Sequence, residues 1–427
     1  MPNLFVGGSA SCGVHNEDYL LKRIKYGDDW NIVSDYKDAD IIIIIDSCVG
    51  SQNSLSMTFS YLEELLKNKK TDAKVILSGC LANGFKLKPN DEIKKLLSNF
   101  KIVNTKDILN YAIRLSDPNF KGLDYNIAYS IGYHKAKLSA VTGCMNHCTF
   151  CKTNYMNFPL RSHPIDKIEK LLKDLDKVFK DNNPLNYILC NSSNLSLYGV
   201  DLYGEQKTHE LIKLLTSLDS VKYAEFGALI NWYPELVNEI ITNPKVKGFL
   251  TSIESGSERI YDKMNRPIEL NKLVDIIKTI KKERPDIPIR TEIIVGFPGE
   301  TLDDLKRTID LLYELDINPA YIWSYTNSPY IKSNDYPQYH KNYIDTASRY
   351  AEEKLRPLQD KLDAKEKSEG FITEKSDEYN GYQLLYPNGE TEFIGYDRIK
   401  GDYQEGDIIN SSNITPKYLV KSKKTSK

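Results

Sequence analysis

The chain has 427 residues, which is long enough for several domains with their own cores and too long for a peptide or a disulfide-stabilised mini-protein. Lys and Arg total 57 against 59 Asp and Glu, and 41% of residues are apolar. This balance excludes both a chain that is basic throughout and a disordered acidic chain. The longest apolar run, residues 41–45, is far shorter than the roughly 20 residues of a membrane span. No signal peptide is recognisable, so we expect a cytoplasmic monomer without a membrane partner.

The first part of the chain alternates short apolar runs with segments of helical spacing. The runs lie near residue 5, at 41–45 and at 75–77, and the helical segments are 16–27 and 54–70. This order predicts a parallel α/β domain over residues 1–115. The polar stretch at 116–126 is typical of a linker.

The same alternation returns over residues 130–365. Six β/α units predict a barrel or open partial (β/α)6 barrel, whose ligands gather at the carboxyl ends of the strands. Amphipathic segments such as 166–181 and 303–315 separate the strands. The expected strands are 137–141, 186–190, 222–227, 248–253, 288–296 and 320–325.

The end of the chain changes character again. Residues 343–367 have the pattern of a helix, and short strand-like pieces follow at 382–386, 391–396 and 407–410. We therefore expect a small, β-barrel-like domain over 370–427, which ends in a basic tail.

Three cysteines lie in one loop after the first barrel strand. Cys144, Cys148 and Cys151 have the spacing C-x3-C-x2-C, and three thiolates can hold three irons of a four-iron cluster while leaving the fourth open. The alternative is a zinc knuckle completed by His147 or Cys190. We interpret Cys190, at the end of an apolar strand, as a packed core thiol, and His147 as a surface residue.

The motif CMNHCTFC resembles the signature of radical S-adenosylmethionine enzymes. The resemblance implies a [4Fe–4S] cluster whose open iron binds S-adenosylmethionine, and cleavage of that cofactor to a 5′-deoxyadenosyl radical. It also implies a small reductant such as flavodoxin or ferredoxin. The protein would position the cofactor and exclude water from the radical.

Three more cysteines each follow an N-terminal apolar run. Cys12, Cys48 and Cys80 would meet at one edge of a parallel sheet, although separate buried thiols are the alternative. The combination resembles the methylthiotransferase family, whose N-terminal domain carries an auxiliary cluster on three such cysteines. That resemblance implies a second [4Fe–4S] cluster here.

Further blocks resemble the same family in the expected order. They are Arg161–Ser162, NLSLYG at 194–199, SGSERIYDKMNR at 255–266, IIVGFPGET at 293–301 and a C-terminal segment like a TRAM domain. Departures are Glu254 in place of the usual Gln and the substrate-facing segments 152–160 and 326–334. By resemblance, the contacts to S-adenosylmethionine would come from Phe150, Asn194, Ser255, Ile294 and Gly296.

The resemblance implies a radical methylthiotransferase that inserts a methylthio group at an unactivated C–H bond. We expect tRNA as the substrate, at C2 of a modified adenosine beside the anticodon. The tail lysines from Lys417 to Lys427 could contact phosphates. Methylthiolation of a ribosomal protein side chain remains an alternative. A second is a non-catalytic, metal-dependent RNA-binding protein, which would leave GFPGE and NLSLYG unexplained.

Overall fold

The computed structural model describes ten stretches of the chain, and all structural statements refer to them. The described residues are 2–8, 31–46, 52–83, 91–103, 127–132, 134–151, 159–179, 184–327, 331–376 and 379–415. The predicted helix at 16–27, the linker at 116–126 and the basic tail lie outside these residues.

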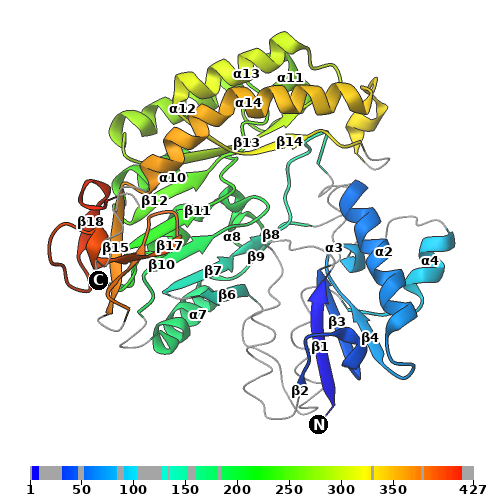
Figure 1. Cartoon of the computed structure of the whole chain (residues 1–427). Coiled ribbons are helices and arrows are strands. Elements are labelled where there is room, and N and C mark those ends of the chain that lie inside the picture. The colour runs from blue at the N-terminus through cyan, green and yellow to red at the C-terminus, as the bar shows by residue number, and fades with distance from the viewer. Residues whose placement is uncertain are drawn as a thin grey trace, which may run out of the picture.

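The N-terminal domain is the predicted parallel sheet, in which the three predicted strands β1, β3 and β4 are adjacent (Figure 1). Two short strands that were not predicted extend it to the order β2-β1-β3-β4-β5. Ile42 and Ile44 on its central strand pack against Leu62 and Leu65 of helix α2, since the apolar spacing of that helix places both leucines on one face. The elements are β1 (Asn3–Gly8), β2 (Asn31–Ile32), β3 (Ile41–Asp46), α2 (Gln52–Asn68), β4 (Lys74–Leu77), α3 (Cys80–Asn83), α4 (Asp91–Leu97) and β5 (Lys101–Ile102).

The central domain contains the six parallel strands that the sequence predicts, and one more. The sheet order is β14-β13-β12-β11-β10-β7-β6, and the additional strand β6 pairs antiparallel with β7. A separate two-stranded ladder, β8 with β9, follows the first barrel strand. The strands are β6 (Ala128–Gly132), β7 (Lys135–Ser139), β8 (Val141–Thr142), β9 (Arg161–Ser162), β10 (Tyr187–Cys190), β11 (Tyr223–Phe226), β12 (Val246–Leu250), β13 (Ile289–Val295) and β14 (Asn318–Ser324).

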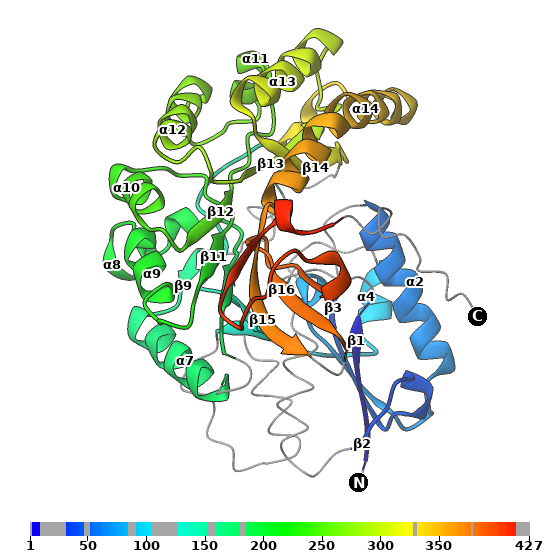
Figure 2. The same cartoon turned by 60° about the vertical axis from the view of Figure 1, so that its left-hand side comes forward.

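Helices cover the outer face of this curved sheet (Figure 2). The longer helices each bury one apolar stripe in the main hydrophobic core, as α7 does with Leu171 and Leu175. The capping box of Thr301 and Asp304 starts α13. The helices are α7 (Ile165–Val178), α8 (Val200–Tyr203), α9 (Thr208–Leu215), α10 (Pro234–Thr242), α11 (Glu258–Lys263), α12 (Leu270–Glu283), α13 (Leu302–Leu315) and α14 (Lys341–Glu366).

The C-terminal domain is a four-stranded antiparallel sheet in the order β17-β16-β15-β18. Three of its strands match the predicted ones. The fourth, β15, was not predicted because its sequence EGFITEKS mixes charges into the apolar pattern. The strands are β15 (Glu369–Ser376), β16 (Gly381–Leu385), β17 (Thr391–Gly395) and β18 (Ile408–Asn410).

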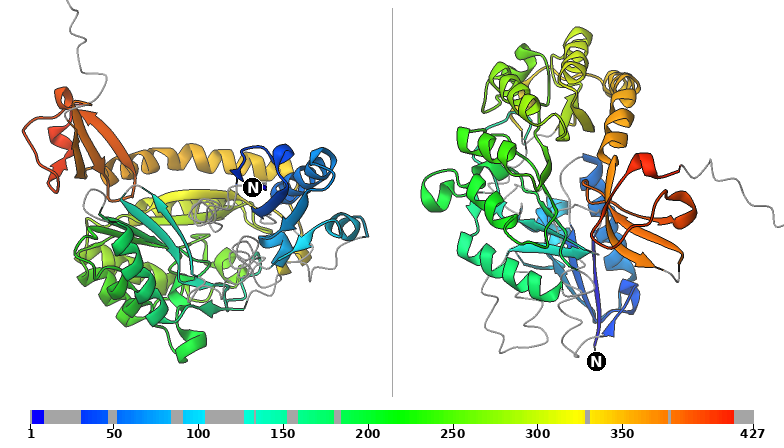
Figure 3. Two further views of the ribbon diagram at one scale, coloured as in Figure 1. Left: turned by 90° about the horizontal axis from the view of Figure 1, so that it is seen from below. Right: turned by 90° about the vertical axis from the view of Figure 1, so that its left-hand side faces the viewer.

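This C-terminal sheet packs on the amino ends of the barrel strands (Figure 3). Tyr187 and Tyr223, the first residues of β10 and β11, form one apolar cluster with Phe371 and Leu385. Gly389, at φ +75°, lies against the Tyr187 ring so closely that a Cβ atom would overlap it. The carboxyl ends of the barrel strands, where parallel sheets place their sites, are therefore at the opposite end.

None of the helices in the described part of the chain is both long and apolar enough to cross a lipid bilayer.

Candidate functional site

The three barrel cysteines lie in a loop that begins directly after β8. Cys148 is buried, and Cys144 and Cys151 are partly exposed. Thr149 anchors the loop, because its amide donates to the Met264 carbonyl and its hydroxyl to the Lys263 carbonyl. The loop thus rests on the end of α11, at the carboxyl ends of the strands.

Nitrogen donors point at two of the three sulfur atoms. The Asn194 side chain and the Asn146 amide each lie 3.4 Å from Cys144 Sγ, and Arg266 Nη1 lies 3.3 Å from Cys148 Sγ. Burial raises the pKa of the Cys148 thiol, and the Arg266 charge opposes this shift. N–H groups directed at sulfur stabilise thiolates, the form in which cysteine binds iron, so these residues fit a cluster.

No group of three or more His, Cys, Asp or Glu side chains in the described ranges could hold a single metal ion. A cubane cluster has different demands, since each cysteine binds its own iron. Neither proposed zinc partner completes such a group: His147 is exposed within the loop, and Cys190 is 0% exposed in the main core. Burial raises the pKa of Cys190 to about 12, and the prediction of a packed core thiol is confirmed.

Arg266 is a site residue that the sequence alone does not reveal. Its guanidinium is buried, donates to the Ser252 carbonyl at 2.7 Å, and lies 5.8 Å from the centre of the Phe150 ring. Glu254 Oε1 lies 3.8 Å from Arg266 Nη1, and burial raises the pKa of this carboxyl to about 7. Burial by itself would lower the pKa of Arg266. The neighbouring Glu254 and Cys148 have the opposite and larger effect, so the pKa of Arg266 stays above its usual value.

The residues expected to contact S-adenosylmethionine have two kinds of surroundings. Phe150 and Ile294 pack at the edge of one apolar cluster beside the cysteine loop, and Asn194 reaches Cys144. Ser255 is fully buried beside Thr308 of α13, and Gly296 takes φ +81°.

The main-chain N–H groups of Ile294 and Gly296 already have hydrogen-bond partners within the protein. The Ile294 amide donates to the Glu254 carbonyl at 3.0 Å, and the Gly296 amide donates to Glu300 Oε2 at 2.5 Å. Glu300 is 2% exposed, and burial raises the pKa of its carboxyl to about 8. Main-chain contacts of Ile294 and Gly296 with a bound cofactor would therefore use their carbonyl oxygens.

Of the N-terminal cysteines, Cys12 and Cys48 lie outside the described residues, and only the backbone of Cys80 is described, at the start of α3. The three strands that precede them, β1, β3 and β4, are adjacent and parallel. Their carboxyl ends share one edge of the sheet. The convergence of the three thiols stays a prediction.

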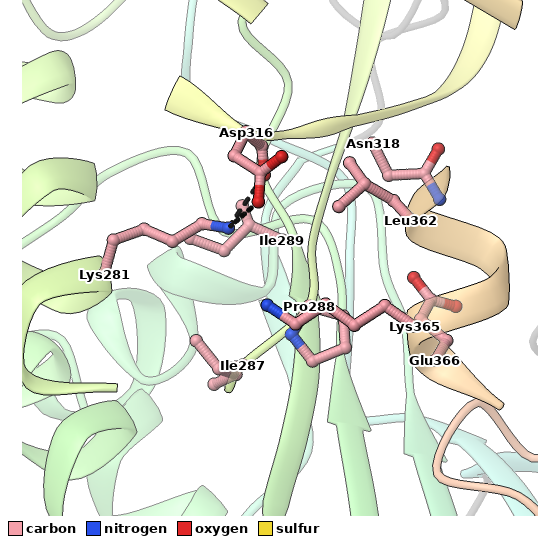
Figure 4. Close-up of a pocket in the computed structure, with 9 residues that line it drawn as sticks. All are labelled: Lys281, Ile287, Pro288, Ile289, Asp316, Asn318, Leu362, Lys365 and Glu366. Carbon is pink, nitrogen blue, oxygen red and sulfur yellow. Dashed lines mark hydrogen bonds and ion pairs between the residues drawn. The ribbon is translucent and has the colours of Figure 1, made fainter. Parts of the chain in front are cut away.

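A separate pocket lies at the other end of the barrel (Figure 4). It is lined by the starts of β13 and β14 and the end of α14, including Lys281, Asp316, Asn318 and Glu366. The loop with the three cysteines contributes nothing to it, so it is no part of the candidate site.

Comparisons with known proteins agree with this geometry. The radical SAM superfamily model matches residues 138–312, which include the cysteine loop and the barrel strands from β10 to β13 but not β14. The chain is 28% identical over 319 residues to the ribosomal protein uS12 methylthiotransferase RimO of Alkaliphilus oremlandii, covering 71% of this chain and 70% of that protein. It is 26% identical over 338 residues to RimO of Clostridium botulinum, covering 74% of each.

A solved structure shares the fold. The radical S-adenosylmethionine methyltransferase TsrM of Kitasatospora setae superposes with a TM-score of 0.52 at 10% identity, over 78% of this chain and 74% of that one. Together with the relatives, this supports S-adenosylmethionine and two [4Fe–4S] clusters as the cofactors. The chain therefore contains a radical SAM domain, and over 71–74% of its length it is similar to radical S-adenosylmethionine methylthiotransferases, from which it has diverged to 26–28% identity.

Proposed function

We propose that the protein inserts a methylthio group into a side chain of a ribosomal protein, and that Cys144, Cys148 and Cys151 hold its radical-generating cluster. The observation that carries the chemistry is the cysteine loop at the carboxyl ends of the barrel strands, with nitrogen donors on two of its sulfur atoms. When bound, the clusters and S-adenosylmethionine would supply the methylated sulfur and the radical that removes hydrogen from carbon. The cysteines Cys12, Cys48 and Cys80 are proposed for the auxiliary cluster.

This chain's own residues prepare the site. Asn194 and Arg266 would keep the cysteine sulfurs as thiolates, because their N–H groups and the arginine charge favour the ionised form. Phe150 and Ile294 would present an apolar wall that excludes water from the reacting atoms.

The charge of the C-terminal domain supports a protein substrate. Residues 369–415 contain ten acidic and three basic side chains. Two of the basic ones are already in ion pairs within the sheet, Lys375 with Asp402 at 2.8 Å and Arg398 with Glu392 at 3.7 Å. Such a surface repels phosphates and attracts a basic protein. The relatives named for ribosomal protein uS12 support the same substrate class.

A tRNA substrate is the second candidate, favoured by the five lysines of residues 416–427. Mass spectrometry of uS12 and of tRNA nucleosides, from cells with and without this protein, separates the two. We expect the methylthio group on uS12 only. If tRNA contains a methylthioadenosine only in cells that have this protein, the proposal of a protein substrate is overturned.

Cysteine variants test the cluster assignment. Reconstituted protein should hold about eight irons, and Cys148→Ala should lose about half of them together with 5′-deoxyadenosine formation. Cys48→Ala should keep that cleavage but make no methylthio product. Cys190→Ala is the matched control, since this buried thiol should leave the iron content unchanged. Cleavage by Cys148→Ala would show that the radical site is elsewhere.

A further inference from the structure

Two aromatic rings are exposed on the edge strand of the barrel sheet. Tyr321 and Trp323 of β14 are 48% and 51% exposed, and their rings stack with centroids 5.6 Å apart and planes 8° apart. Strand β14 is the last in the seven-stranded order, so it borders the opening of the partial barrel. Large aromatic side chains with this exposure are unusual in a strand that only serves the core.

Both rings lie on the inner, concave face of the sheet. Ile322, between them, packs against the main core, and α14 covers that outer face. In the parallel register, Tyr321 pairs with Glu292 and Trp323 pairs with Ile294. Paired residues of parallel strands share a face, so the aromatic pair lies on the same side as Glu292 and the expected cofactor contact Ile294.

Glu292 is partly buried and differs in its partners from the fully buried acids of the barrel. Its side chain accepts a hydrogen bond from the Ser252 hydroxyl at 3.2 Å. No Lys, Arg or His in the described part of the chain lies within ion-pair distance of it, whereas Glu254 and Glu225 each face an arginine. Burial raises the pKa of the Glu292 carboxyl, and the Ser252 hydroxyl and the charge of Arg266, which lies beyond ion-pair distance, only partly oppose this shift.

We propose that Tyr321, Trp323 and Glu292 form a subsite for a positively charged side chain, arginine or lysine, of the protein substrate. This inference rests on the proposed function, and it adds that the substrate carries an arginine or lysine side chain near its modified residue. A cation over an aromatic face gains from the ring quadrupole, and more so in a partly desolvated site. The Glu292 carboxylate supplies the opposite charge beside the rings, and the Ser252 hydroxyl orients it.

Stacking of an RNA base on the same rings is less favourable. A base would bring its phosphates close to Glu292, which has no ion-pair partner among the described residues and feels the charge of Arg266 only from a greater distance. A basic peptide segment does not meet this repulsion.

The experiment measures the affinity of the full-length, reconstituted protein for purified uS12 and for a set of uS12 variants, each with one Arg or Lys replaced by Gln. One uS12 replacement should weaken binding to the wild type about 3- to 30-fold. The same replacement should have little effect when the enzyme carries Glu292→Gln or Trp323→Leu, because the partner group is already gone. This coupling, measured as a double-mutant cycle, identifies the pair directly.

Matched variants keep the result interpretable. Tyr313→Ala removes another tyrosine of similar exposure, 45%, on the outer helix α13, and should leave uS12 binding unchanged. Trp323→Phe keeps a ring for the cation and should restore most of the affinity lost in Trp323→Leu. Far-ultraviolet circular dichroism and iron content must match the wild type in every variant that is compared.

The outcomes separate this inference from the proposed function. If the wild type binds and modifies uS12 but no uS12 replacement couples to Glu292 or Trp323, the subsite is refuted and the proposed function stands. If Trp323→Leu weakens binding of tRNA while leaving uS12 binding intact, the rings serve a base and the subsite is equally refuted. If the wild type neither binds nor modifies uS12, the proposed function fails and the subsite with it.

Discussion

The two ends of the barrel each bury an arginine among carboxylates, but the arginines are paired differently. At the amino ends of the strands, Arg290 donates to Glu225 at 2.7 Å and to Glu366 at 2.5 Å. The Tyr187 hydroxyl donates to the second oxygen of Glu225 at 2.6 Å. This network joins β10, β11, β13 and α14 directly beneath the C-terminal sheet.

At the cysteine end, Arg266 has looser partners. Its nearest carboxylate oxygen, on Glu254, lies at 3.8 Å, and its Nη1 points at Cys148 Sγ instead. The Arg266 Nε atom has no partner among the described groups. Glu254 itself takes the left-handed backbone conformation, at φ +65°, which costs free energy in a residue with a side chain.

The two arginines differ in how directly they meet opposite charge, since Arg290 contacts two carboxylates and Arg266 has one at 3.8 Å. Buried charges are costly unless paired, so the direct pairing of Arg290 indicates a structural joint, although Glu366 Oε1 has no hydrogen-bond partner among the described groups. Incomplete pairing and backbone strain tend to occur where a further ligand completes the site. The comparison therefore predicts larger stability effects at the amino end and pH-sensitive ones at the cysteine end.

The largest effect is expected for Arg290→Leu. It leaves the carboxylates of Glu225 and Glu366 buried without their counter-charge, which should cost about 3–5 kcal/mol of unfolding free energy. Urea unfolding of the cluster-free protein measures the loss. Lys306→Ala, in an exposed pair with Asp303, is the control and should change the free energy by less than about 0.5 kcal/mol. If Arg290→Leu loses no more unfolding free energy than Lys306→Ala, the interpretation of this network as a structural joint is refuted.

A pH effect of intermediate size is expected at the cysteine end. Since the folded-state pKa of Glu300 is about 8 and its ordinary value is 4.5, the folded protein holds a proton that the unfolded chain has released. The Glu300 contribution to stability therefore falls as the pH rises from about 4.5 to 8. The wild type should lose unfolding free energy between pH 4.5 and pH 8, and Glu300→Gln should make this loss smaller by roughly 2–4 kcal/mol. Urea unfolding across the pH range measures it.

Glu314→Gln, at an exposed helix position, is the control for that experiment and should leave the pH profile of the wild type unchanged. A Glu300→Gln profile parallel to that of the wild type would contradict the raised pKa of Glu300.

A smaller loss is expected for Tyr187→Phe. It removes the hydroxyl that donates to Glu225 and leaves a buried carboxylate oxygen without that donor, at a cost of about 1–3 kcal/mol. Burial and the neighbouring Glu225 keep the pKa of Tyr187 well above 10, so the loss should be the same at pH 6 and pH 8. Tyr313→Phe, whose hydroxyl bonds the Lys354 carbonyl at the surface, should cost far less in the same measurement.

The smallest loss is expected for Arg266→Gln at pH 6. Glu254, with a pKa of about 7, is mostly protonated there and needs little counter-charge, so about 1 kcal/mol should be lost in the cluster-free protein. At pH 8 the loss should grow, because ionised Glu254 is then buried without the arginine. If Arg266→Gln loses as much unfolding free energy at pH 6 as Arg290→Leu does, the two arginines are equally important for stability and the contrast between the two barrel ends is wrong.

Local patterns predicted most of the fold. The period of apolar residues identified the six parallel barrel strands and helix α14, because each buries one face against a neighbouring layer. Strand β6 escaped prediction because its pairing partner β7, not its own composition, makes it a strand. Strand β12 begins at Val246 and ends at Leu250, earlier than the predicted 248–253, since a bulge in its pairing with β11 shifts the register.

Spacing along the chain was enough to identify the three cysteines of the loop, their place after the first barrel strand and the family they signal. The folded chain was needed to show that Arg266 reaches Cys148 across 118 positions, that Glu254 faces it, and that Tyr321 and Trp323 share a face with Glu292. It also decided that the C-terminal sheet covers the barrel end opposite the cysteines. Such contacts depend on how distant segments are packed together, and local periodicity carries no record of that packing.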